Sequence, residues 1–327
     1  MAWLMTERGP ILALGPIDDV VVDHLRPFGD VIEVGAGDVS IADLLPMAIG
    51  LIARGSSVVD RQVITAAGNL RVIGRSGIGV DLVDLASASE RRIPVVVTPN
   101  AGTNAVAEGA LALILHLVKR LGPLTELVRE GRWAERESVD VGDLEGATLG
   151  IVGFGRIGRR LAELGGALNM SVVAFDPYAD PLTASGLGVD LVDLDRLAET
   201  ADVISLHAPL TAETTHLIDA AVLDRVRSGT VLVNCGRGGL LDLDAVHAAL
   251  LDGRLAGVGL DVFEPEPPPP GGHPIFQHPA VVLTPHVLGL SRRAKRRIFQ
   301  EMTDGMASVL AGGRAMNIAN PEIYDEA

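Results

Sequence analysis

The feature that most constrains this chain is a glycine motif, GFGRIG at residues 153–158, which directly follows the apolar run TLGIV. A helix-period segment, RIGRRLAELGGAL, follows it at once. In a strand-to-helix turn of this kind, Gly153 serves the tight turn, Gly155 the close approach of a pyrophosphate, and Gly158 the packing of helix on strand. The helix start at Arg156 and Ile157 then offers unpaired N–H groups to the phosphates. An ordinary glycine-rich turn is the alternative.

Short apolar strands alternate with helix-period segments along the whole chain. The first series of expected strands is 11–14, 30–34, 51–53, 70–74 and 95–98, and the second series begins at 148, 172, 202, 230, 257 and 281. This alternation is typical of βαβ units built on a parallel sheet. We therefore predict an α/β fold of two doubly wound parallel-sheet domains.

Two segments lie between the series. The apolar segment 103–121 is expected to form one long buried helix, because its apolar residues would occupy nearly the whole circumference of that helix. The polar segment 124–146 is expected to be irregular and to pack on another subunit.

The composition narrows the classes of partner. The net charge is −15, so no global positive field would attract nucleic acid, and the basic run at 292–297 is expected to be a solvated helix face. No apolar segment reaches the roughly 18–20 residues of a membrane span, and the N-terminus does not resemble a signal peptide. Cys235 is the single cysteine, which fits a reducing compartment. We expect a cytoplasmic protein without nucleic-acid or membrane partners.

The cofactor is indicated by Asp176, which ends the strand beginning at 172, roughly 20 residues beyond the glycine motif. A carboxylate at this position accepts hydrogen bonds from a ribose 2′-OH and repels a 2′-phosphate. Pro177 and Tyr178 follow, with no arginine to hold such a phosphate. The sequence therefore favours NAD over NADP.

Three polar residues follow later strands of the second series: Arg237, Glu266 and His286. Ligands of open α/β sheets bind at the carboxyl ends of the strands, so these side chains are expected to converge beside the dinucleotide. A histidinium whose charge is stabilised by a paired carboxylate can supply the proton that accompanies hydride transfer. His273 and His278 lack a third ligand at suitable spacing, so we expect no metal site.

The chain resembles the D-isomer-specific 2-hydroxyacid dehydrogenase family, and within it the phosphoglycerate dehydrogenase branch. The matching motifs are GRSGIGVDLVD (74–84), TPNAGTNAVAE (98–108), LGIVGFGRIGRRLA, SLHAPLTAETTHLI (205–218), VNCGRGGLLD, GLDVFEPEP and LTPH. The resemblance implies a Rossmann cofactor domain, 101–289, inserted into a flavodoxin-like substrate domain, 1–100 plus 290–327. It further implies a homodimer or homotetramer in a short form without regulatory domains.

The resemblance also implies roles for single residues. Arg237 would bind the substrate carboxylate and keto oxygen, and His286, paired with Glu266, would be the acid/base. The remaining cofactor-lining positions would be His207, Ala208, Pro209, Cys235, Gly236 and Asp261, beside Arg237 and His286 themselves. His207 has a structural role at a strand end as its alternative, and Cys235 is expected to be a small buried filler.

The far end of the substrate is indicated by Arg54 and Arg75, which follow two strands of the first series and match positions that hold a phosphate in the phosphoglycerate branch. Ser76, Gly77 and Ile78 would line the same site. The expected substrate pair is therefore 3-phosphoglycerate and 3-phosphohydroxypyruvate, with a glyoxylate/hydroxypyruvate reductase as the alternative. An NAD(H)-sensing binding protein like the family's corepressor branch is the alternative of another class. Leu288 and Leu290 depart from the family, which has small residues there.

Overall fold

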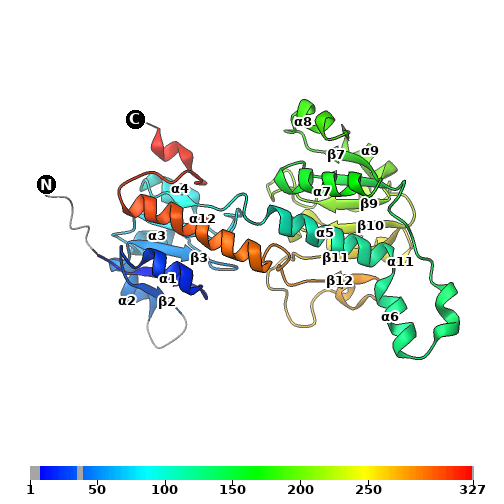
Figure 1. Ribbon diagram of the computed structural model, residues 1–327, viewed down its shortest axis with the longest axis horizontal. Helices are drawn as coiled ribbons and strands as arrows, with labels where there is room; N and C mark the ends of the chain where they lie inside the picture. Colours follow the sequence, from blue (N-terminus) through cyan, green and yellow to red (C-terminus); the bar gives the residue numbers. More distant parts are fainter. Residues whose placement is uncertain (1–7, 35–39, 326–327) are drawn as a thin grey trace. The chain divides into compact units, whose positions relative to one another are not determined.

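The computed structural model describes residues 8–34 and 40–325, and the chain divides into two compact units. One unit contains the described residues up to Gly102 together with those from Arg292 onward, and the other is Thr103–Ser291. Each unit is built on a parallel sheet flanked by helices (Figure 1). This confirms the predicted fold class of two parallel-sheet α/β domains.

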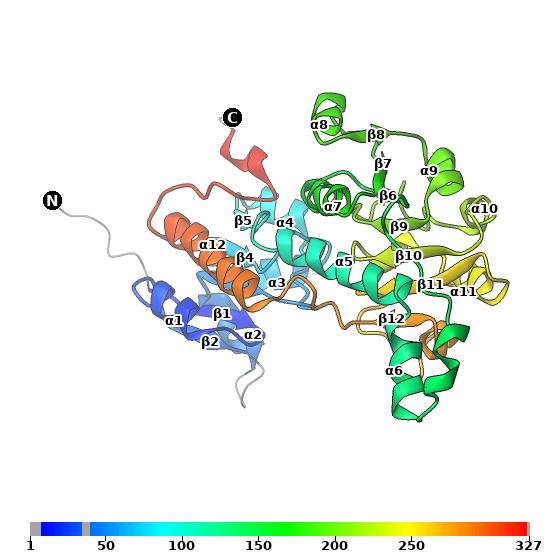
Figure 2. The same cartoon turned by 45° about the vertical axis from the view of Figure 1, so that its right-hand side comes forward.

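The first unit has five parallel strands in the order β2-β1-β3-β4-β5, the flavodoxin-like arrangement. They are β1 (Ile11–Leu14), β2 (Val31–Glu33), β3 (Gly50–Ala53), β4 (Val72–Arg75) and β5 (Val95–Val96). The helices are α1 (Asp19–Leu25), α2 (Ile41–Leu44), α3 (Arg61–Ala66), α4 (Leu85–Glu90) and α12 (Arg292–Leu310). The helix α12 packs beside α1 over one face of this sheet (Figure 2).

Aspartates set where the short helices of the first unit begin. The carboxylates of Asp18, Asp60 and Asp84 each accept a hydrogen bond from a backbone N–H in the first turn of α1, α3 or α4. Such a cap satisfies a donor that has no partner within the helix. Each of these caps ends the loop that follows β1, β3 or β4.

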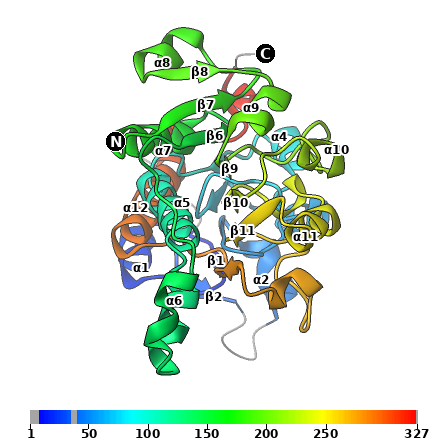
Figure 3. The same ribbon diagram turned by 90° about the vertical axis from the view of Figure 1, so that its right-hand side faces the viewer.

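The second unit has seven parallel strands in the order β12-β11-β10-β9-β6-β7-β8, the Rossmann arrangement with one added strand. They are β6 (Thr148–Val152), β7 (Ser171–Phe175), β8 (Val189–Leu191), β9 (Val203–Leu206), β10 (Thr230–Asn234), β11 (Leu255–Leu260) and β12 (Val281–Leu283). One face is covered by α5 (Thr103–Val118) and α7 (Arg156–Ala167). The other is covered by α9 (Leu194–Thr200), α10 (Ala220–Leu223) and α11 (Leu243–Leu251), as Figure 3 shows. A short helix, α8 (Pro181–Gly186), lies between β7 and β8.

The long buried helix expected at 103–121 is present as α5, but it ends at Val118, because Arg120 takes a left-handed conformation with φ +52°. The expectation for the next segment was wrong. The segment predicted to be irregular contains α6 (Leu121–Arg129) and a 3-10 helix at Trp133–Ser138. This helical arm, residues 121–142, extends away from the sheet of the second unit (Figure 2). Among the described residues, no helix combines the length and apolar character needed to cross a membrane.

Candidate active site

The glycine motif forms the turn between β6 and α7, where the strand order of the second sheet reverses. Gly153 has φ +93°, and a Cβ on it would lie 2.5 Å from the backbone nitrogen of Ala208 in the loop after β9. A Cβ on Gly158 would lie 2.2 Å from the carbonyl oxygen of Gly153. Within the described parts of the chain, nothing lies within 4 Å of the Cβ position of Gly155, the uncapped N-cap of α7. The open space before a free helix N-terminus fits a pyrophosphate.

Asp176 follows β7 and turns back toward this loop. Its Oδ2 accepts a hydrogen bond from the backbone N–H of Phe154 at 2.8 Å, and its Oδ1 accepts one from the N–H of Tyr178 at 2.9 Å. Phe154 stands between the first two glycines of the motif and is 4% exposed. The carboxylate predicted to read the ribose therefore also fixes the turn that would hold the pyrophosphate.

The imidazole of His207, after β9, is partly buried in the second unit. Its Nε2 lies 2.9 Å from Ser205 Oγ, and its buried Nδ1 has no hydrogen-bond partner among the described residues. Burial lowers the pKa of His207 to about 4, so the ring is neutral at pH 7. A neutral ring with one unsatisfied nitrogen beside the glycine turn is compatible with both expected roles.

The loop after β10 is held by a residue that the sequence reasoning missed, Asn234. Its Oδ1 accepts a hydrogen bond from the N–H of Gly236 at 3.0 Å, and its Nδ2 donates to the carbonyl oxygen of Arg237 at 2.8 Å. Its position just before CGRG was the available clue. Cys235 is 8% exposed and, as expected, a buried filler. Burial raises the pKa of this thiol far above its usual value, which leaves it protonated and unreactive.

Arg237, Glu266 and His286 follow β10, β11 and β12, three neighbouring strands of the second sheet. His286 Nδ1 lies 2.8 Å from Glu266 Oε2, so the structure brings this predicted pair together. Their side chains are 48% and 37% exposed, which leaves both in contact with solvent. Arg237 Nη1 donates to the carbonyl oxygen of Gly236 at 2.8 Å. This arrangement offers a guanidinium and a carboxylate-bound imidazole at the sheet edge that ligands use in such folds.

Asp261, expected to line the cofactor, is 2% exposed at the end of β11. Its Oδ1 accepts hydrogen bonds from Thr284 Oγ1 at 2.7 Å and from the N–H of Val287 at 3.0 Å. Burial raises the pKa of this carboxyl group above its usual value. Asp261 therefore ties the turn that carries His286 to the neighbouring strand.

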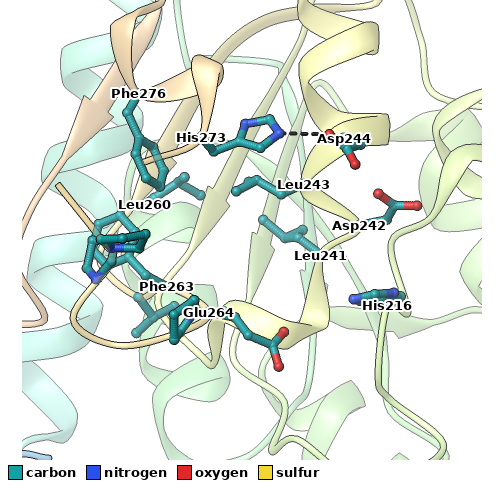
Figure 4. A pocket seen from close by; sticks show the side chains of 15 residues that line it. His216, Leu241, Asp242, Leu243, Asp244, Leu260, Phe263, Glu264, His273 and Phe276 are labelled. Carbon is teal, nitrogen blue, oxygen red and sulfur yellow. Dashed lines mark hydrogen bonds and ion pairs between the residues drawn. The ribbon is translucent and has the colours of Figure 1, made fainter. Parts of the chain in front are cut away.

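A separate pocket of about 350 Å³ opens between the loop after β11 and the start of α11 (Figure 4). His273 stands at its edge, where Nε2 contacts Asp244 Oδ1 at 2.8 Å and Nδ1 accepts from the N–H of Ile275 at 3.2 Å. The side chain is only 20% exposed, so His273 anchors the proline-rich loop on α11.

In the described residues, no group of three or more His, Cys, Asp or Glu side chains is arranged to hold a metal ion.

Arg54 follows β3 and Arg75 ends β4 in the first unit. Arg75 donates from Nε to the carbonyl oxygen of Gly79 and from Nη2 to that of Gly55, each at 2.9 Å. The Arg54 guanidinium carbon lies 4.8 Å from the centre of the Phe299 ring. Its buried Nε has no hydrogen-bond partner in the described parts of the chain, and burial lowers the pKa of Arg54.

The residues after Arg75 form the loop predicted to line the substrate site. The N–H of Ser76 donates to the carbonyl oxygen of Ala53 at 3.1 Å, which joins this loop to the end of β3. Gly77 has φ +146°, and the side chain of Ile78 is 51% exposed. The five predicted substrate residues therefore lie around two adjacent strand ends.

Comparison with known proteins identifies the second unit. The family model described as "D-isomer specific 2-hydroxyacid dehydrogenase, NAD binding domain" matches residues 111–287. The chain is 35% identical to the D-3-phosphoglycerate dehydrogenase of Archaeoglobus fulgidus over 313 residues, 95% of this chain and 59% of the relative. It is 37% identical to that of Mycobacterium tuberculosis (strain H37Rv) over 319 residues, 94% of this chain and 60% of the relative. The chain thus spans about three fifths of the length of these relatives.

Solved structures similar to this chain include enzymes of different substrates. A D-lactate dehydrogenase from Aquifex aeolicus, complexed with NAD and lactic acid, has a TM-score of 0.86 at 26% identity, covering 95% of this chain and 99% of its own. An NADPH-dependent glyoxylate/hydroxypyruvate reductase from Sinorhizobium meliloti has a TM-score of 0.84 at 29% identity, covering 96% and 99%. These findings confirm the predicted family and its cofactor, NAD, but leave the substrate to be inferred from the site.

Proposed function

We propose that this chain, which belongs to the D-isomer-specific 2-hydroxyacid dehydrogenase family, interconverts a D-2-hydroxy acid and its 2-keto acid with NAD. The observation that carries the proposal is the 2.8 Å contact of His286 Nδ1 with Glu266 Oε2. Glu266 follows β11, and the adjacent strand β10 precedes the turn that contains Arg237. An imidazole held by a carboxylate, in the same sheet as a dinucleotide turn and after a strand parallel to the one before that turn, is suited to proton transfer coupled to hydride transfer.

NAD would be held by the glycine turn at 153–158 and by Asp176, and it would supply or accept the hydride at C2 of the substrate. Because Nδ1 of His286 faces Glu266, Nε2 is the nitrogen that gives a proton to the keto oxygen during reduction and takes it back during oxidation. Glu266 stabilises the protonated ring through this contact. The planar guanidinium of Arg237 suits a carboxylate, and its charge stabilises negative charge that develops on the keto oxygen.

For the substrate, we propose a 2-hydroxy acid with a second anionic group, 3-phosphoglycerate and 3-phosphohydroxypyruvate first among them. Arg54 supports this because it stands at the end of β3, where the strand order of the first sheet reverses. Its half-buried guanidinium has an unsatisfied Nε, and a buried cation without a full set of partners is unfavourable until an anion meets it. Glyoxylate, with a single carboxylate, would leave it unmatched.

The test is a panel of 2-keto acids assayed by NADH oxidation: 3-phosphohydroxypyruvate, hydroxypyruvate, glyoxylate and pyruvate. We expect the phosphorylated acid to give the highest kcat/KM. Arg54→Gln is expected to raise KM for that substrate by roughly 10-fold or more, the worth of one charge-assisted hydrogen bond, and to leave glyoxylate turnover nearly unchanged. Arg61→Gln is the matched control, since Arg61 is a surface arginine of the same unit paired with Glu90 at 2.9 Å.

The outcomes of the panel separate the alternatives. Equal kcat/KM for glyoxylate and the phosphorylated acid would make the chain a glyoxylate/hydroxypyruvate reductase. Tight NADH binding without turnover of any 2-keto acid would instead indicate an NAD(H)-sensing binding protein and refute the proposed activity.

We further propose that the helical arm at 121–142 pairs two copies of the chain in a homodimer, alone or within a homotetramer. The arm exposes apolar side chains that a monomer would leave in water: Val128 is 62% exposed and Trp133 is 64% exposed. Light scattering of the purified chain is expected to give at least twice its 34.2 kDa mass, and a monomer at micromolar concentration would refute the pairing.

A further inference from the structure

The turn that carries His286 has a backbone conformation that its surroundings must impose. His286 has φ +50°, in the left-handed region that residues other than glycine seldom occupy. The N–H of His286 donates to the carbonyl oxygen of Thr284 at 3.0 Å, and the N–H of Leu290 donates to that of Val287 at 2.8 Å. These local bonds shape the turn but do not place it relative to the sheet.

One attachment comes from Asp261. Besides Thr284 Oγ1 and the N–H of Val287, its carboxylate accepts from the N–H of Leu288 at 3.3 Å. The three donors stand on both sides of His286. A carboxylate that is 2% exposed therefore holds the turn to the end of β11 on one side.

The second attachment is a contact with α5 that depends on the absence of a side chain. A Cβ on Gly109 would lie 2.6 Å from Leu288 Cβ and 3.0 Å from its Cγ and Cδ1. Leu288 thus sits directly on the backbone of α5 at Gly109. Because the nearest atom is the Cβ of Leu288, which moves only with its backbone, any side chain at Gly109 would displace the turn itself.

This contact explains where the unusual leucine goes. Leu288 packs against the apolar cluster between α5 and the sheet, together with Val106, Ile114 and other residues of that helix. The next residue follows the same surface, since a Cβ on Gly289 would lie 3.2 Å from Val106 Cγ2. A large side chain at 288 therefore serves as a fixed contact between the turn and α5.

We propose that Leu288 and Gly109 form a positioning pair that sets the imidazole of His286 against Glu266. The proposal rests on the acid/base role proposed for His286. In this proposal Leu288 acts on His286 through the backbone of the turn and does not contact the substrate. The Cβ of Leu288 makes a glycine at 109 necessary, whereas a glycine at 288 would tolerate a side chain at 109.

The test compares Gly109→Ala, Leu288→Gly and the double variant. Gly109→Ala is expected to lower kcat roughly 10- to 100-fold, the effect of moving a catalytic group by about 1 Å, and to leave the Kd for NADH within about 3-fold of wild type. Leu288→Gly is expected to lower kcat less, because it loosens the turn without displacing it. Adding Gly109→Ala to Leu288→Gly is then expected to cost less than about 3-fold, because the clash is gone.

Gly166→Ala in α7 is the matched control for adding a methyl group to a helix, because no described atom lies within 4 Å of its Cβ position. It is expected to leave kcat unchanged. The pH profile of kcat for keto-acid reduction is a second readout. The fall of kcat with rising pH is expected to begin at lower pH in Gly109→Ala, because a displaced imidazole loses the carboxylate that stabilises its charged form.

A ring-proton NMR titration of His286, assigned with His286→Ala, measures the same displacement without turnover. The titration is expected to shift in Gly109→Ala and to return toward that of Leu288→Gly in the double variant. An unchanged kcat and titration in a folded Gly109→Ala variant, or equal losses from Gly109→Ala in both backgrounds, would overturn the pair. An inactive wild type that still shows the NMR pattern would refute the proposed activity and not the positioning.

Discussion

Replacing Asp176 by alanine is expected to have two separable effects, one on cofactor choice and one on the glycine turn. The carboxylate accepts hydrogen bonds from the N–H groups of Phe154 and Tyr178, at 2.8 and 2.9 Å. In the proposed complex the same carboxylate binds the ribose hydroxyls of NAD. Asp176→Ala removes all of these acceptors at once.

The magnitudes follow from the surroundings of the two amides. The Phe154 N–H belongs to a residue that is 4% exposed, so the loss of its acceptor is expected to cost about 1–3 kcal/mol of unfolding free energy. The side chain of Tyr178 is 87% exposed, and water can replace the acceptor of its N–H. For a unit of this size, Tm is expected to fall by roughly 2–12 °C. Loss of the ribose contacts is expected to weaken NADH binding by about 10- to 100-fold.

The assay pairs a thermal melt with the ratio of kcat/KM for NADH to that for NADPH. Wild type is expected to prefer NADH, and Asp176→Ala to lose most of that preference while its Tm falls. Asp176→Asn keeps one carbonyl oxygen and is expected to lose the preference with a smaller fall in Tm. Asp180→Ala, which removes the cap of the nearby α8, is expected to leave the ratio unchanged. Wild-type Tm and an unchanged ratio in Asp176→Ala would refute both roles.

Two further changes test the acid/base pair and the partly buried His207. His286→Ala is expected to lower kcat on the order of 10²- to 10⁴-fold with NADH binding kept, and a near-wild-type kcat would exclude it as the proton donor. Glu266→Gln is expected to shift a limb of the pH–rate profile, and an unchanged profile would argue against the pairing. Because burial lowers the pKa of His207 from 6.5 to about 4, the unfolded chain binds a proton that the folded chain does not between these values. Unfolding free energy is therefore expected to fall by up to about 3 kcal/mol as the pH drops from 6.5 to 4. Above pH 6.5 the contribution of the neutral His207 ring to stability is fully present. His207→Asn, compared with wild type by denaturant melts across that range, is expected to remove this part of the fall, and parallel curves would contradict it.

The strand ends could be predicted from the sequence because each buried strand is an apolar run closed by glycine, proline or aspartate. For this reason the sequence alone locates the glycine motif, Asp176 and the residues after β10, β11 and β12. The edge strand β8 was missed, since Val189–Leu191 is three residues long and contains an exposed aspartate, Asp190. The sequence does not predict the helices of the arm, because its charged residues obscure the helical spacing of the few apolar ones.

Contacts that depend on two distant segments could not be predicted. Nothing in the sequence places Gly109 opposite Leu288, which stands almost 180 residues later. The second role of Asp176 was hidden for the same reason, because a loop 22 positions earlier supplies the N–H that it binds. A motif gives the type of residue at a site, whereas the partner that orients it depends on the tertiary packing.

Glu266 and Asp261, two carboxylates of the candidate site, show how burial divides similar groups among different tasks. Asp261, 2% exposed, accepts only from groups of the chain itself, and a group so enclosed cannot exchange a proton with water in each catalytic cycle. Glu266, 37% exposed, faces an imidazole that is 48% exposed, so in the proposed mechanism His286 takes up a proton from solvent after each reduction. The proposed proton donor therefore depends on two carboxylates. The exposed Glu266 stabilises its charged form, and the buried Asp261 holds its solvent-facing turn, in which His286 has φ +50°, to the neighbouring strand.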